Sequence, residues 1–192
     1  MNSFPEREGR PNVPEKRRWW SRGRRRLTGL LAALGVLAAV FAEVEIQIEG
    51  AAGWAANLPT WRVDQHWALD LVWGGRPLTG YHVWMFLFMA LVFHLLFFIH
   101  ARPCVRLELR VLGSLAVFWI LEDFFWFILN PAYGLARFNS RCIPWHHHWV
   151  LGVPRDYLVF LVLGGLFFRL SFRRWKPQPY PDVNSDSASG ES

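Results

Sequence analysis

The chain has only two cysteines, Cys104 and Cys142, and they lie far apart in the sequence. A cysteine redox pair or a cysteine-ligated zinc site needs a close spacing such as Cys-x-x-Cys, which is absent. The topology predicted below places the two cysteines on opposite sides of a membrane, so we expect no disulfide between them. Redox or zinc chemistry based on a cysteine pair is therefore excluded.

Several familiar metal motifs are also missing. The sequence contains no His-Glu-x-x-His, and it lacks the paired Glu-x-x-His motif of di-iron helical bundles. A haem held by two histidines needs them on different helices at similar depth. Only one apolar stretch, 83–99, holds buried histidines, so a haem is not expected.

A basic patch of the kind that binds nucleic acid is absent, although the formal charge is +6. Nine of the 21 basic residues fall between Arg7 and Arg26, directly before an apolar run, and most of the others sit in short connections between apolar runs. This placement is typical of residues that orient a membrane protein. We therefore expect the lipid bilayer, and not nucleic acid, as the partner.

Apolar residues are abundant, with 53% hydrophobic and 17% aromatic residues, which is more than an ordinary soluble domain holds. The sequence predicts an all-α integral membrane protein, a bundle of four transmembrane helices. The second and fourth spans are shorter than the roughly 20 residues that cross a bilayer, and flanking Arg and Trp side chains can make up the difference by snorkelling. The predicted spans are about 27–48, 83–99, 111–129 and 157–172.

Both ends of the chain are predicted to be disordered and cytoplasmic. Residues 1–26 form a basic tail, residues 27–175 the membrane domain, and residues 176–192 a tail rich in Pro and Ser. Basic residues precede the first span, fill the connection between the second and third, and follow the fourth. The outer loops, 50–81 and 130–155, hold fewer for their length, so both termini are expected inside a bacterial-type inner membrane.

Two local features qualify this topology. The first apolar run, ending near Ala42, also resembles a secretory signal, and cleavage there would leave three spans in the same orientation. The segment 54–73 has four tryptophans, and Arg62, His66 and Asp70 recur at helical spacing. It is predicted to be an amphipathic helix in the headgroup layer. Thr79 is expected to cap the second span.

Ionisable residues inside spans are the first candidates for function, because a charge in hydrocarbon costs about 2.5–3.5 kcal/mol. Glu122 and Asp123 lie in the third span, and Glu43, Glu45 and Glu49 close the first. The topology brings these acids to the outer leaflet, where His82, the run His146-His147-His148 and Asp156 also lie. For the three glutamates the simplest interpretation is a helix end that rises into water.

The convergence of imidazoles and carboxylates predicts a metal or acid–base site. The hypothesis is that His82, His146, His148 and Glu122 hold a divalent metal such as zinc or iron. In an extended segment His146 and His148 point to the same side. Glu122 and Asp123 are the candidate catalytic residues, one of them a general base toward water, and the substrate is a lipid or another hydrophobic molecule.

Two other functions compete with this hypothesis. In one, the protein is a non-enzymatic membrane subunit or scaffold, whose polar residues fix helix packing or bind a partner. In the other it is a small ion or proton transporter, which needs polar residues through the whole depth of the membrane. The inner half holds little beyond His94, His100 and Glu108, so a continuous path is not expected.

Overall fold

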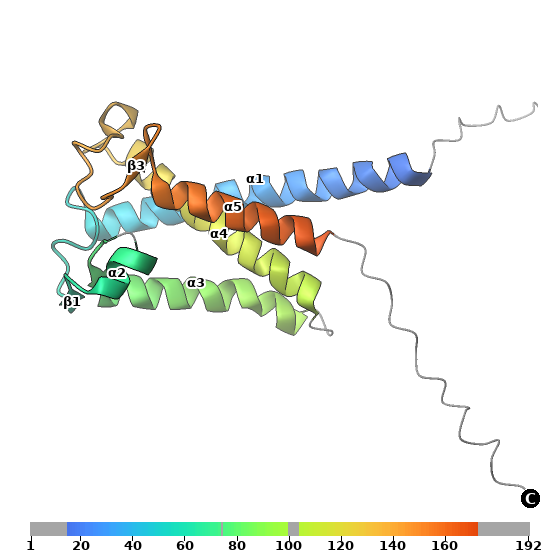
Figure 1. Cartoon of the computed structure of the whole chain (residues 1–192), viewed down its shortest axis with the longest axis horizontal. Helices are drawn as coiled ribbons and strands as arrows, with labels where there is room; N and C mark the ends of the chain where they lie inside the picture. The colour runs from blue at the N-terminus through green and yellow to red at the C-terminus, as the bar shows by residue number, and fades with distance from the viewer. Residues whose placement is uncertain (1–14, 74, 100–103, 173–192) are drawn as a thin grey trace, which may run out of the picture.

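The computed structural model describes residues 15–73, 75–99 and 104–172 and is mostly helical. Four long helices form a bundle, and the two long connections, 50–79 and 130–154, gather at one end of it (Figure 1). The N-terminal part of the first helix projects beyond the others at the opposite end. The α-helices are α1 (Glu15–Glu49), α2 (Trp67–Val72), α3 (Gly80–Ile99), α4 (Val105–Leu129) and α5 (Arg155–Ser171).

Each long connection contains a short antiparallel strand pair. In the first, Arg62 pairs with Thr79 and Val63 with Leu78. In the second, residues 151 and 152 form a two-residue turn with positive φ at both positions, which is the backbone that a tight hairpin requires. The strands are β1 (Arg62–Val63), β2 (Leu78–Thr79), β3 (Trp149–Val150) and β4 (Val153–Pro154), and a 3₁₀ helix, η1, covers Leu135–Arg137.

Helix α4 is the central helix, packed along α1 on one side and α5 on the other. The α4–α5 contact is close because small residues meet there, as is common between membrane helices. A Cβ added at Gly113 would lie 3.3 Å from the carbonyl oxygen of Gly164 and 3.3 Å from the ring of Phe168. These glycines therefore set the separation of the two helices.

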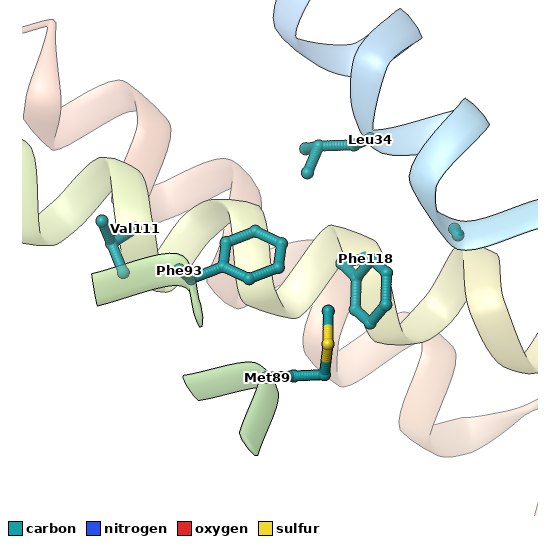
Figure 2. Packing of buried hydrophobic residues seen from close by; sticks show 6 residues of the cluster. Leu34, Met89, Phe93, Val111 and Phe118 are labelled. Atoms are coloured by element: carbon teal, nitrogen blue, oxygen red, sulfur yellow. The ribbon is translucent and has the colours of Figure 1, made fainter. Parts of the chain in front are cut away.

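The middle of the bundle is an apolar core (Figure 2). Leu34 from α1, Met89 and Phe93 from α3, and Val111 and Phe118 from α4 are buried together. On α1 the buried residues recur every fourth position, at 34, 38, 42 and 46, so one stripe of the helix faces the bundle. A second apolar cluster, around Trp126, Phe127 and Ile143, lies nearer the loop end.

Two helices are long and apolar enough to cross a membrane, within Arg25–Glu49 and Val105–Leu129, and Gly80–Leu95 is a shorter apolar helix. Only 17% of the most apolar stretch of the first is buried, so it is not the core helix of a soluble domain. Large apolar side chains also point outward from α3 and α5. Examples are Trp84, Phe88 and Leu91 on α3 and Leu161 and Val162 on α5.

Helix ends follow the predicted signals at some positions and differ at others. Thr79 caps α3 as expected, its hydroxyl accepting from the backbone N–H of His82 at 3.3 Å. Helix α4 ends at Leu129 before the Asn-Pro pair but begins at Val105, not 111. Residues 15–26, expected in the disordered tail, are the first turns of α1, whereas 1–14 and 176–192 lie outside the described residues.

The amphipathic helix predicted over 54–73 is wrong. Arg62 lies in β1, His66 is the N-cap of α2 with its Nδ1 accepting from Ala68 N–H at 3.2 Å, and only Asp70 is helical. Prediction failed here because spacing alone does not reveal strand pairing: Arg62 pairs with a residue 17 positions later in the chain. The segment folds back over the end of the bundle instead of forming one long helix.

Candidate functional site

A cavity of about 430 Å³ opens at the loop end of the bundle, and helices α1, α3, α4 and α5 all contribute to it. Five tryptophans form much of its wall: Trp54, Trp73, Trp119, Trp126 and Trp145. The ionisable residues that line it are Glu45, Glu49, Arg76, His82, Glu122, Asp123 and Asp156. The chain therefore brings five carboxyl groups into one mostly aromatic pocket.

Helix α1 delivers two of the acids by its periodicity. Glu45 and Glu49 are one turn apart and share the buried side of the helix with Ala42 and Ile46. They are 7% and 9% exposed, whereas Glu43 points outward. The interpretation of a helix end in water thus holds for Glu43 alone. The sequence signal for the burial of Glu45 and Glu49 is the helical spacing that connects them with the small and apolar residues at 34, 38 and 42.

His146 is the centre of a charge network behind the pocket wall. Its side chain has no exposed surface, and its Nε2 lies 3.0 Å from Oδ2 of Asp123. Its Nδ1 lies 3.4 Å from Oδ2 of Asp156, without hydrogen-bond geometry. Burial lowers the pKa of His146, but the attraction of Asp123 and Asp156 outweighs burial, so the net pKa is raised.

The two aspartates of this network each have a second partner. The hydroxyl of Tyr157 donates to Asp123, and the guanidinium of Arg76 pairs with Asp156. The same guanidinium lies 4.7 Å from the ring centre of Trp54. His146 does not line the cavity, whereas Asp123 and Asp156 do, so His146 holds these two carboxylates from behind.

His82 lies elsewhere in the pocket and has different partners. Its Nδ1 is 2.6 Å from the hydroxyl of Thr79, and its ring stacks on Trp54 with centroids 4.0 Å apart. Its Nε2 faces Oε1 of Glu49 at 3.7 Å. His82 therefore faces the carboxylate of Glu49, whereas His146 faces those of Asp123 and Asp156.

Glu122 is the least satisfied of the acids. It is 4% exposed, and its Oε1 has no hydrogen-bond partner among the residues that the structure describes. Its carboxyl group is within hydrogen-bonding reach of Glu45, which also accepts from the hydroxyl of Tyr81 at 3.0 Å. Two carboxyl groups can hydrogen-bond to each other only when one carries a proton. Glu122 is thus poised to take a proton or a donor from a ligand.

The residues predicted as metal ligands are only partly brought together. Glu122 and His82 line the cavity and His146 supports it, but His148 is exposed. His146 is buried and His148 is exposed, so the run does not bring both imidazoles to the cavity as expected. In residues 15–73, 75–99 and 104–172 no group of three or more His, Cys, Asp or Glu is arranged to hold a metal ion.

Sequence reasoning missed Arg76, Tyr81 and Tyr157 as parts of the site. Arg76 follows two glycines and read as a turn residue, and the two tyrosines look like members of an interfacial aromatic belt. Their roles depend on contacts across 80, 36 and 34 positions of the chain, respectively. No local pattern carries such contacts.

Comparison with known proteins does not extend this description. No family model, curated protein or solved structure matches the chain. The geometry of the site combines a pocket of ligand size, aromatic walls and carboxyl groups.

Proposed function

We propose that the protein is a multi-pass inner-membrane protein whose pocket binds the polar head of a lipid or another amphiphilic molecule at the outer leaflet and carries out acid–base chemistry on it. In this proposal α1, α3, α4 and α5 all cross the bilayer, with both termini cytoplasmic. Outward-facing apolar side chains on α3 and α5 support it, since water would not tolerate so many. The distribution of basic residues supports the orientation.

The observation that carries the proposal is the pocket itself. Its volume of about 430 Å³ falls in the range of roughly 300–1,000 Å³ for small-molecule sites. Tryptophans at headgroup depth suit a molecule with one apolar and one polar end. The five carboxyl groups then lie where the polar end would be.

The division of roles follows from which groups line the cavity. Asp123 and Glu122 reach the cavity and are the candidate catalytic residues. Asp123, held by His146 and Tyr157, is fixed as an acceptor suited to a general base. Glu122, whose Oε1 has no hydrogen-bond partner among the described residues, is suited to accept a hydrogen bond or a proton from the bound molecule. His146 is a positioning residue.

The metal-assisted form expected from the sequence has less support, because Glu122 and His82 line the cavity whereas His146 lies behind its wall against Asp123. It predicts stoichiometric zinc or iron in protein purified in detergent, lost in Glu122→Ala and His146→Ala. Metal-free wild-type protein of normal stability contradicts that form and leaves the acid–base form in place.

A scaffold is the competing proposal, favoured by the structural partners that Asp123 and Asp156 already have in His146 and Arg76. The two proposals predict different effects of a conservative substitution on the binding of an amphiphile. Glu122→Gln keeps the shape of the pocket, and Glu43→Gln on the exposed side of α1 is the matched control.

Native mass spectrometry and lipid extraction of the purified protein separate the two. Under the proposed function, wild type and Glu43→Gln retain a bound amphiphile that Glu122→Gln loses, with all three folded. If no amphiphile accompanies the wild type, or if Glu122→Gln retains it fully, the scaffold is favoured.

A further inference from the structure

The charge inside the pocket is unbalanced. Five carboxyl groups line the cavity, and its only lining guanidinium, among the described residues, is that of Arg76, which is already paired with Asp156. His146 supplies one further cation from behind. Glu45, Glu49 and Glu122 therefore have no lysine or arginine side chain beside them among the described lining residues, and a cation in the pocket would let one of them ionise.

The position of Glu45 and Glu49 on helix α1 makes their ionisation more costly. Glu45 and Glu49 lie in its last two turns, and no basic residue occupies the last turn. The C-terminal end of a helix carries partial negative charge, so ionised acids there are destabilised and a cation is favoured. A group of positive charge in the pocket would relieve both effects.

The pocket wall is suited to a cation. The guanidinium of Arg76 lies 4.7 Å from the ring centre of Trp54 and 6.0 Å from that of Trp73, within the range of cation–π contacts. Trp119, Trp126 and Trp145 offer further rings around the remaining space. The protein therefore already uses these walls to hold one positive group.

Among the described residues, three buried polar atoms of pocket-lining side chains have no hydrogen-bond partner, namely Oε1 of Glu122 and Nε1 of Trp73 and Trp126, and they indicate what a ligand must supply. Oε1 of Glu122, a residue 4% exposed, needs a hydrogen-bond donor. Nε1 of Trp126, also 4% exposed and lining the cavity, needs an acceptor. A quaternary ammonium has no N–H and satisfies neither atom, whereas an aminoalcohol-type head satisfies both.

We propose that the ligand is an amphiphile with a protonated amino head, whose N–H donates to Glu122 and whose neighbouring oxygen accepts from Trp126. This deepens the proposed function and rests on it, because it names the class of molecule that the same pocket takes. The tryptophan rings surround the ammonium, and Glu122, ionised when the ligand binds, balances its charge.

The test uses four probes with the same dodecyl chain: dodecylammonium, dodecyltrimethylammonium, dodecanol and dodecyl sulfate. Each is titrated into protein in maltoside micelles, and binding is followed by intrinsic tryptophan fluorescence. The whole chain has a formal charge of +6 and favours anions, so a preference for a cation reports the pocket. Dodecylammonium is expected to bind at least tenfold more tightly than dodecanol and more tightly than the trimethyl compound.

Variants localise the effect. Glu122→Gln should remove the tenfold preference, and Glu43→Gln should keep it. Far-UV circular dichroism checks that both are folded. If Glu122→Gln does not fold, Glu45→Gln is used, since it also removes a lining carboxylate.

The outcomes are distinguishable. Equal binding of dodecylammonium and either dodecanol or the trimethyl compound overturns the ammonium proposal while leaving amphiphile binding intact. Tightest binding of the sulfate, or an unchanged preference in the folded glutamine variant, also overturns it. If none of the four probes binds, the proposed function itself fails.

Discussion

The contact between His146 and Asp123 offers the sharpest test of the site's architecture. The imidazole has no exposed surface, and its Nε2 lies 3.0 Å from a carboxylate oxygen that is only partly exposed. Removing one partner of a buried charged pair costs about 3–5 kcal/mol. Asp123 keeps the hydroxyl of Tyr157, and Asp156 keeps Arg76, so His146→Gln should fall at the lower end, near 3 kcal/mol.

A double-mutant cycle separates this contact from its surroundings. His146→Gln, Asp123→Asn and the double variant are unfolded in mixed micelles of increasing dodecyl sulfate content, with tryptophan fluorescence as the readout. The coupling energy should be about 2 kcal/mol, in the range for directly interacting residues. His147→Gln, at an exposed neighbouring position, is the control and should be nearly neutral. Additive effects, with a coupling below about 0.5 kcal/mol, would refute the network described above.

Two further predictions concern pH and topology. The pKa of His146 is raised by its carboxylate neighbours, so its stabilising contribution is complete below the ordinary histidine pKa of about 6.5 and lost as the pH rises through the folded value. Wild type should therefore lose stability relative to His146→Gln as the pH rises above about 6.5, and a difference that stays constant as the pH rises contradicts the assigned charge. In the proposed orientation, an impermeant thiol reagent added outside cells should label Cys142, near the pocket end, and leave Cys104, at the start of α4, unlabelled. The opposite labelling would place the pocket on the cytoplasmic side.

Much of the fold was accessible from the sequence because hydropathy and helix-terminal residues act locally. The apolar runs located all four long helices, and the Asn-Pro pair and Thr79 marked two of their ends. The order and orientation of the predicted spans were enough to place the acids and His82 at the same end of the bundle. The extra turns at the start of α1 were missed because charge density suggested disorder in a segment that is helical.

The detail of the site was less accessible. Whether Glu45 faces the bundle or water depends on the rotation of α1, which the stripe of small and apolar residues at 34, 38, 42 and 46 encodes only once a partner helix is known. The burial of His146 and the exposure of His148 depend on how their loop packs against the end of α4. The folded-back path of 54–73 depends on strand pairing across 17 residues. In each case the local conformations have similar energies, and contacts with residues distant in the sequence decide which one forms.

The placement of the pocket has a consequence for biogenesis. Helix α1 is synthesised first, yet the groups that surround its two buried glutamates come later: Tyr81 in α3, His82 beside it, and Glu122 in α4. His146 and Asp156, which complete the charge network, follow only with the last helix. In the proposed topology, the nascent chain must therefore keep two acids at the membrane surface without their final partners during insertion. The pocket is complete only when all four helices are present. Truncated chains that lack α5 would therefore stay in this intermediate state and be open to degradation by the cell's quality control.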